Sequence, residues 1–258
     1  MSKVVACHCN RLDVLEMQLT SLERMCLDLD EIIVVNDGLS PKLRVQIREL
    51  CSKHKIATCW DFPIDIDHSS PSFAVGALQQ WAYDRLTDVK APQSGKVAFF
   101  DGDLFPLKPF RVSDYLQTNT LAGLPQDRAH VRYLWAGFVF IDLDRLIRPW
   151  TVNWNCGIAE CQNVDTLGML HHHFRECGTE HVRFLSHTSH LSHDKISKLT
   201  CCPTEVKAAY DEEFKIEVME DGFLHYGRCS NWSGDLEALL RRKDIYVESW
   251  LKSAGSIP

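Results

Sequence analysis

Strand and helix patterns alternate through the N-terminal part of the chain, and this alternation restricts the fold more than any other feature. Short apolar runs at Lys3–Cys9, Glu31–Val35 and Ala57–Phe62 are typical of strands. Between them, apolar residues at helical spacing predict helices over 12–26 and 41–53. A strand–helix–strand–helix–strand order predicts a parallel sheet with right-handed crossovers.

A fourth apolar run, Val97–Phe100, follows a helix predicted over Phe73–Leu86 and ends in Asp101-Gly102-Asp103. Such a run is typical of a buried parallel strand, and ligands bind just outside the carboxyl ends of these strands. Two carboxylates this close repel each other unless a cation lies between them, and Mg²⁺ and Mn²⁺ prefer oxygen ligands. Gly102 would let the backbone turn and approach closely. The sequence predicts a metal–diphosphate site here, with an ordinary turn as the alternative.

Beyond Phe110 the pattern changes, and strands and helices no longer alternate regularly. We expect a single domain over residues 1–258, with a nucleotide- and donor-binding subregion at 1–110 and an acceptor-side subregion at 111–258. The strands expected in the second part are 120–124, 133–141, 181–185 and 214–219, and 223–227 is a short apolar segment. The helices expected there are 164–176 and 232–250.

Composition excludes several classes of protein. The chain has 258 residues, 45% hydrophobic and 24% charged, and a formal net charge of −7, which argues against a nucleic-acid partner. No apolar run is long enough to cross a membrane. The 11 cysteines match neither a zinc pattern nor a disulfide scaffold, so we expect reduced thiols and a cytoplasmic location. The oligomeric state is left open.

Three further residues are candidates for binding a nucleotide or a metal. Asp37 follows the second strand, where its carboxylate could accept hydrogen bonds from a base or ribose or could simply cap a turn. The imidazole of His225 could complete a metal shell or lie in the core, and Arg228 could contact a phosphate. Neither a dinucleotide-binding glycine motif nor a P-loop occurs in the N-terminal half.

Other polar residues have simpler explanations. Asn10 precedes the first helix and is expected to cap it. Asp165 lies where the 164–176 helix would begin, so it could cap that helix or hold a sugar hydroxyl. Three adjacent histidines, 171–173, cannot converge on one ion, because consecutive helical residues point about 100° apart. We expect these histidines on a solvated helix face.

Three features of the sequence together resemble metal-dependent glycosyltransferases of the GT-A fold. Cys9-Asn10-Arg11 with Ile33–Gly38 is similar to the uridine-binding half of sugar-nucleotide transferases, and Phe99–Asp103 is similar to their D-x-D metal motif. Trp135–Ile141 resembles a strand of the retaining, glycogenin-like enzymes. Small transferases of this kind also occur in large DNA viruses. The resemblance implies an α/β, Rossmann-like mixed sheet, with a nucleotide-binding half followed by an acceptor-side half.

This resemblance also implies an activity: transfer of a sugar, which we expect to be glucose, from a UDP-sugar to a glycan or protein acceptor with retention of configuration. Mn²⁺ or Mg²⁺ would be held by Asp101, Asp103 and His225. Asp165 and, as the weaker candidate, Asp142 would hold the donor sugar. The residues expected around the nucleotide are Ala6, Cys7, His8, Asn10, Arg11, Asp37, Gly76, Asp101, Gly102, Asp103, Gly137 and Arg228.

The chain departs from this pattern at two places. Val164 stands where a polar residue would face the anomeric carbon, and Ser230-Asn231 stands where Lys-Pro would follow the late histidine. A nucleotide-sugar-binding protein with weakened catalysis is therefore the alternative. A phosphohydrolase or nucleotidyltransferase is disfavoured, because Phe105 replaces the Thr or Val of such phosphatases and no glycine-rich basic loop follows the first strand.

Overall fold

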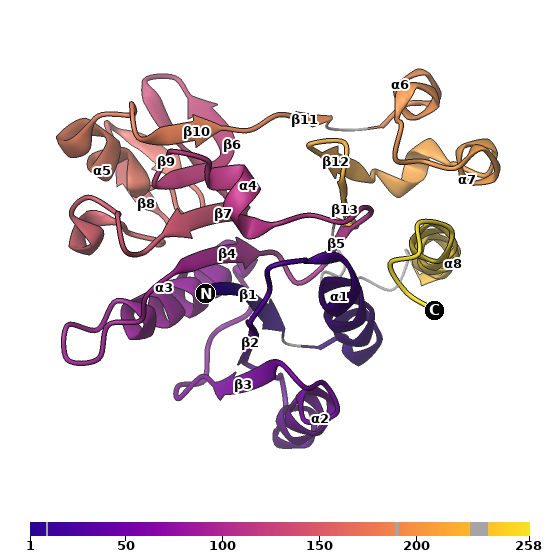
Figure 1. Ribbon diagram of the computed structural model, residues 1–258, viewed down its shortest axis with the longest axis horizontal. Coiled ribbons are helices and arrows are strands. Elements are labelled where there is room, and N and C mark those ends of the chain that lie inside the picture. Colours follow the sequence, from indigo (N-terminus) through magenta and orange to yellow (C-terminus); the bar gives the residue numbers. More distant parts are fainter. Residues whose placement is uncertain (9, 189–190, 228–236) are drawn as a thin grey trace. The chain divides into compact units, whose positions relative to one another are not determined.

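The computed structural model describes residues 1–8, 10–188, 191–227 and 237–258 (Figure 1). The chain divides into two compact units that interleave along the sequence. The first unit comprises Met1–Cys9, Asp28–Gly102 and Arg111–Leu185, and the second comprises Asn10–Leu27, Asp103–Phe110 and Ser186–Pro258. The division therefore does not follow a single cut near residue 110.

A seven-stranded mixed sheet forms the centre of the first unit, in the order β10-β6-β7-β4-β1-β2-β3. Every neighbouring pair is parallel except those made by β7, which runs antiparallel to both β4 and β6. This mostly parallel α/β sheet confirms the predicted fold class. The strands are β1 (Ser2–His8), β2 (Glu31–Asn36), β3 (Ala57–Asp61), β4 (Lys96–Phe100), β6 (Leu121–Arg128), β7 (Val131–Asp142) and β10 (Val182–Phe184).

The helices of this unit lie on the sheet, and Figure 1 shows α2 (Pro41–Cys51) beside β3. The Ser40 hydroxyl accepts a hydrogen bond from the backbone N–H of Leu43 and so caps α2. The other elements are α3 (Pro71–Leu86), α4 (Val112–Leu116), the short 3-10 helix η1 (Pro149–Thr151), the hairpin of β8 (Gly157–Ala159) and β9 (Gln162–Val164), and α5 (Leu170–Cys177).

The core of the first unit lies between the sheet and α3. Leu78 of α3, Phe99 of β4 and Trp154 belong to one buried cluster, in which the Phe99 and Trp154 ring centroids are 4.2 Å apart. Burying a side chain of this size contributes roughly 1.5–3 kcal/mol, so this cluster holds β4 and the residues that follow it in place.

The second unit contains a small antiparallel sheet in the order β11-β12-β13-β5. Its strands are β5 (Leu104–Pro106), β11 (His187–Thr188), β12 (Glu217–Met219) and β13 (Phe223–His225). Its helices are α1 (Leu12–Met25), α6 (His193–Lys198), α7 (Thr204–Ala208), the 3-10 helix η2 (Glu212–Phe214) and α8 (Glu237–Ser253). Phe105, Leu224 and Trp250 share its core, and the buried amide of Gln18 donates to the Leu104 carbonyl. These contacts place β5 with the C-terminal elements.

Several predicted elements differ from those observed. Arg11, not Asn10, is the N-cap residue of α1, and it makes no side-chain capping bond. The predicted helix over 164–176 begins only at Leu170, because Gln162–Val164 pair with Gly157–Ala159 as a hairpin. The end of the predicted 232–250 helix is confirmed by α8, whereas its beginning lies outside the described residues.

The histidines of α5 do not form a solvated face, which corrects the prediction. His171 and His173 are buried and His172 is exposed. The His173 ring lies between the Thr151 hydroxyl, 2.7 Å from its Nδ1, and His181, whose Nε2 is 3.2 Å from its own Nε2. Burial and the neighbouring His181 lower the pKa of His173 to about 4.

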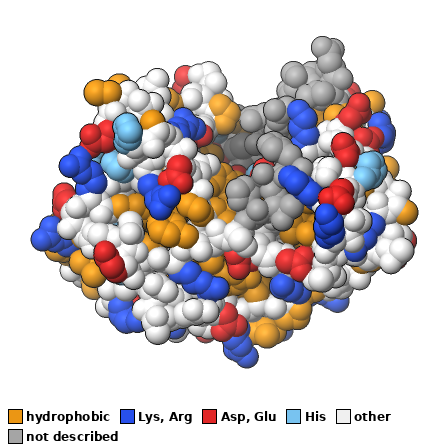
Figure 2. All heavy atoms as spheres, turned by 90° about the horizontal axis from the view of Figure 1, so that it is seen from above, with side chains coloured by type: hydrophobic (Ala, Val, Ile, Leu, Met, Phe, Trp, Pro, Cys, Tyr) orange, Lys and Arg blue, Asp and Glu red, His pale blue; other side chains and the backbone are white. Residues whose placement is uncertain are grey.

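The surface carries charges of both signs. On the face shown in Figure 2, basic and acidic side chains are interspersed with exposed hydrophobic ones. Of the helices that the structure describes, none is long and apolar enough to span a membrane. No disulfide joins any two of the nine cysteines in the described part of the chain.

Candidate functional site

The first unit brings polar side chains to the carboxyl edge of its parallel strands. In the β1–β2 register His8 pairs with Asn36, and in the β1–β4 register Ala6 pairs with Phe100. Asp37 and Asp101 directly follow β2 and β4, so both emerge beside the end of β1. This edge is where α/β sheets bind ligands.

Gly102 allows a close approach at this edge. A Cβ on Gly102 would lie 2.6 Å from the Cys7 carbonyl oxygen, a distance that real Cβ atoms do not show. Gly137 on β7 has a matching role, because its carbonyl accepts the Asp101 N–H at 2.9 Å and a Cβ there would meet the Trp135 ring. The backbone of the acidic motif is therefore fixed against both β1 and β7.

Asp37 is a buried carboxylate with an unused acceptor. Asp37 has 2% of its surface exposed, and its Oδ1 has no hydrogen-bond partner in the described part of the structure. Its Oδ2 lies 3.5 Å from His68 Nε2. Burial raises the pKa of Asp37 to about 7, against the lowering effect of Arg44. An unpaired buried oxygen costs about 1–3 kcal/mol, so this atom is suited to accept a ligand N–H or O–H.

In the second unit, His225 lies between two carboxylates. Its Nε2 is 3.2 Å from Asp103 Oδ1, and its Nδ1 is 2.9 Å from Glu217 Oε2. The sheet creates this arrangement, because His225 of β13 pairs with Glu217 of β12 on one side and with Leu104, next to Asp103, on the other. The Asp103 carbonyl also accepts the N–H of Tyr226 at 2.9 Å.

Within the second unit, Asp103 and His225 offer two neighbouring ligand atoms that could hold one metal ion. Asp101 is separated from Asp103 by a single residue, so chain connectivity keeps its carboxylate within reach. In an octahedral site with bonds of about 2.1 Å, adjacent ligand atoms are about 3.0 Å apart. The 3.2 Å between His225 Nε2 and Asp103 Oδ1 fits that spacing. An imidazole beside carboxylates suits a transition metal such as Mn²⁺ better than Mg²⁺.

The remaining predicted residues lie in other settings. The Arg11 guanidinium contacts Asp13 and lies 3.1 Å from Asp244, and Asn10 forms a bend before α1. Gly76 is a packing residue of α3, since a Cβ there would lie 3.0 Å from the Trp154 carbonyl oxygen. Arg228 lies outside the described residues.

The two carboxylates expected to hold the donor sugar do not share a setting. Asp165 follows the β8–β9 hairpin and is partly exposed, and its Oδ1 accepts the N–H of Thr166 while its Oδ2 lies 3.6 Å from Arg128. Asp142 pairs with Lys96 at the opposite end of β4 from Asp101, about 16 Å away along the strand. It also bonds to Arg145 at 2.8 Å. The structure therefore does not bring Asp142 to the ligand edge, which corrects that prediction.

Sequence reasoning missed Glu217, although the sequence contains a signal for it. Asp221-Gly222 between two apolar runs is typical of a hairpin turn. Counting outward from a two-residue turn would place Glu217 opposite Tyr226, whereas the observed loop has three residues, 220–222, and pairs Glu217 with His225. The signal therefore identifies the hairpin but not its register.

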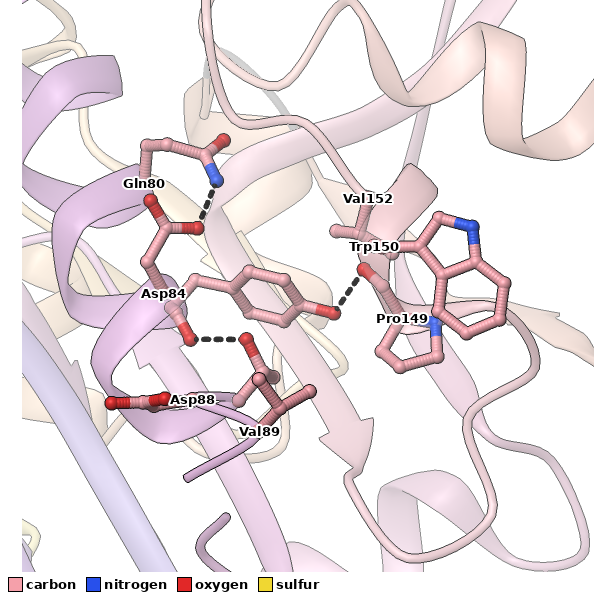
Figure 3. Close-up of a pocket in the computed structure, with 9 residues that line it drawn as sticks. Gln80, Asp84, Asp88, Val89, Pro149, Trp150 and Val152 are labelled. Atoms are coloured by element: carbon pink, nitrogen blue, oxygen red, sulfur yellow. Dashed lines mark hydrogen bonds between the residues drawn. The ribbon is translucent and has the colours of Figure 1, made fainter. Parts of the chain in front are cut away.

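A separate pocket of about 330 Å³ lies on the first unit between α3 and η1 (Figure 3). At this pocket the Tyr83 hydroxyl donates a hydrogen bond to the Pro149 carbonyl at 2.8 Å, and the Gln80 amide donates one to Asp84 at 2.7 Å. Trp150, which also lines the pocket, is 78% exposed. None of the residues predicted from the sequence lines this pocket.

Comparison with known proteins supports the fold. No protein-family model matches the chain, and no curated protein matches it. Among solved structures, the galactosyltransferase LgtC in complex with donor and acceptor sugar analogues is 17% identical. The match covers 100% of this chain and 96% of that one, with a TM-score of 0.51.

Two further matches are partial. Glucosyl-3-phosphoglycerate synthase from Mycobacterium tuberculosis is 16% identical over 71% of this chain and 68% of its own, with a TM-score of 0.45. The mannosyltransferase PcManGT from Pyrobaculum calidifontis, solved with GDP-Man and Mn²⁺, is 12% identical over 55% and 44%, with a TM-score of 0.37. The full-length match to LgtC shows that the chain has the GT-A glycosyltransferase fold.

Proposed function

We propose that this protein is a Mn²⁺-dependent glycosyltransferase that moves a sugar from a UDP-sugar to a glycan or protein acceptor. The observation that carries the proposal is the acidic motif after β4, in which Asp103 is paired with the imidazole of His225 at 3.2 Å. The fold is shared with LgtC, a galactosyltransferase whose structure holds donor and acceptor sugar analogues. Glucose as the sugar and retention of configuration are expectations from the resemblance to glycogenin-like enzymes.

The residues have separate tasks in this proposal. A bound divalent ion would supply Lewis-acid stabilisation of the charge that develops on the departing diphosphate. Asp101, Asp103 and His225 provide its ligands. Asp37 accepts a hydrogen bond from the base through its unpaired Oδ1, and the backbone of Ala6–His8 lines the base. The partly exposed carboxylate of Asp165 accepts a hydrogen bond from a hydroxyl of the donor sugar.

One observation favours a second candidate, a nucleotide-sugar-binding protein with weakened catalysis. Val164, at the position expected to face the anomeric carbon, is a buried apolar side chain of β9. It can neither stabilise a positive charge nor accept a proton. Hydrolysis of UDP-glucose without an acceptor separates the two candidates, because a binding protein retains affinity and shows no turnover.

A thermal-shift screen tests the donor and the metal together. UDP, UDP-glucose, UDP-galactose and GDP-mannose are each added with Mn²⁺, with Mg²⁺ and with EDTA. A ligand at 100 times its dissociation constant stabilises the folded state by about 2.7 kcal/mol. We expect the largest shift with a UDP-sugar and Mn²⁺; shifts that are equal in EDTA would contradict the metal site.

The anomeric outcome and the location need separate measurements. ¹H NMR of the freshly transferred sugar gives the configuration, and retention is expected. The free thiols in the described part of the chain fit a reducing compartment, and we propose the cytoplasm, that of the host if the source is a virus.

A further inference from the structure

We propose that Glu217 is a positioning residue that fixes the ring of His225 so that Nε2 is presented to the metal ion. This inference rests on the proposed metal site. It assigns to Glu217 no contact with the ion, the nucleotide or the sugar.

The geometry comes from the β12–β13 hairpin. Glu217 and His225 are directly opposite each other, and side chains at opposed positions lie on the same face of a sheet. Glu217 Oε2 is 2.9 Å from His225 Nδ1, which leaves Nε2 on the Asp103 side at 3.2 Å. The His225 and Glu217 side chains are 12% and 23% exposed, so water competes weakly for the bond.

The chemistry follows from the two nitrogens of imidazole. A neutral imidazole carries one N–H and one lone pair, and Glu217 beside Nδ1 favours the proton at that atom. Asp103 beside Nε2 has the opposing effect until an ion neutralises its charge. The lone pair is then on Nε2, directed to the acidic motif. When an ion binds, it takes the place of any proton on Nε2 while the Nδ1–H remains bonded to Glu217. Such a partner raises the basicity of the ligand and fixes its orientation.

The test compares three substitutions. Glu217→Ala and Glu217→Thr remove the acceptor, and threonine also suits a strand, which guards against a folding defect. Glu217→Gln keeps an acceptor oxygen at the same reach. Glu213→Ala, at an exposed glutamate of η2, is the control. Mn²⁺ affinity is measured by calorimetry without nucleotide, and circular dichroism confirms folding.

We expect Mn²⁺ affinity to fall about 10–100-fold in Glu217→Ala and Glu217→Thr, as for other partners of metal-binding histidines. Glu217→Gln should lie closer to wild type than to Glu217→Ala, and Glu213→Ala should match wild type. Affinity that is unchanged in the folded Ala and Thr variants would overturn the role of Glu217.

A second measurement needs no metal. ¹⁵N NMR of the His225 ring in metal-free Asp103→Ala, which removes the competing carboxylate at Nε2, should show the proton of the neutral ring on Nδ1, and adding Glu217→Gln should preserve this. Loss of that preference is expected in Glu217→Ala, and an unchanged tautomer would refute the proposal. If wild type binds no Mn²⁺ while the NMR result holds, the proposed metal site fails although the Glu217–His225 contact stands.

Discussion

The buried carboxylate of Asp37 should reduce the free energy of unfolding at neutral pH, so Asp37→Asn should make the protein more stable. The same substitution removes the negative charge and should weaken nucleotide binding. Burial raises the Asp37 pKa from 3.8 to about 7. Each unit of pKa difference corresponds to about 1.36 kcal/mol, so ionising this group in the folded state costs at most about 4 kcal/mol. Relaxation around the charge reduces the cost, and we expect about 2 kcal/mol in practice.

The sign of the pH dependence follows from proton binding. Between pH 4 and 7 the folded protein retains a proton on Asp37 that the unfolded chain has lost, so the contribution of Asp37 to stability falls as the pH rises through this range and is constant above it. Asparagine does not titrate. The stability difference between Asp37→Asn and wild type should therefore be small near pH 4 and largest above pH 7.

Urea denaturation of both proteins at several pH values measures this difference. Groups other than Asp37 titrate in both proteins, so their contributions cancel when the two free energies of unfolding are subtracted. Nucleotide binding is measured on the same samples by thermal shift with UDP and Mn²⁺. Parallel stability curves for the two proteins would refute the buried-carboxylate argument. Because asparagine keeps an acceptor oxygen, Asp37→Leu is measured beside it, and an unchanged UDP shift in Asp37→Leu would remove Asp37 from the nucleotide site and leave the stability argument intact.

Three further predictions concern single residues. Asp103→Asn should abolish the Mn²⁺-dependent part of the UDP thermal shift while the protein remains folded; a wild-type shift would exclude Asp103 as a ligand. Gly102→Ala should weaken UDP–Mn²⁺ binding at least tenfold by calorimetry, because its Cβ would lie 2.6 Å from the Cys7 carbonyl oxygen. Burial lowers the pKa of His173 to about 4, so its contribution to stability, complete above pH 6.5, should be lost as the pH falls to 4. His173→Gln should flatten that part of the urea-measured stability profile, and an unaltered profile would contradict the assignment.

Local patterns predicted the central strands well. The runs that became β1, β2, β3 and β4 are short, apolar and bounded by polar residues, so period and length alone identify them. The acidic motif was also accessible, because it directly follows such a run. Both of its carboxylates lie within three consecutive residues, 101–103.

Strand direction and the pairing of distant segments could not be predicted from local sequence patterns. The sequence of β7 indicates a strand but not its direction, and a parallel β7 would have carried Asp142 to the same edge as Asp101. Because β7 is antiparallel, Asp142 lies at the other edge. Asp165 was assigned to a helix start because the short hairpin before it leaves no periodic signal. The grouping of α1 and β5 with the C-terminal elements depends on packing between distant segments.

The partly buried turn between β12 and β13 sets the register of Glu217 against His225. Glu220 and Asp221 there have φ values of 49° and 45°, a left-handed conformation that few residues adopt readily. Adding or deleting one residue in this loop would slip the hairpin register and send the glutamate or the histidine to the reverse side of the ribbon. Insertions in this three-residue loop should thus weaken cation binding without altering any ligand, so natural variation in its length should be rare.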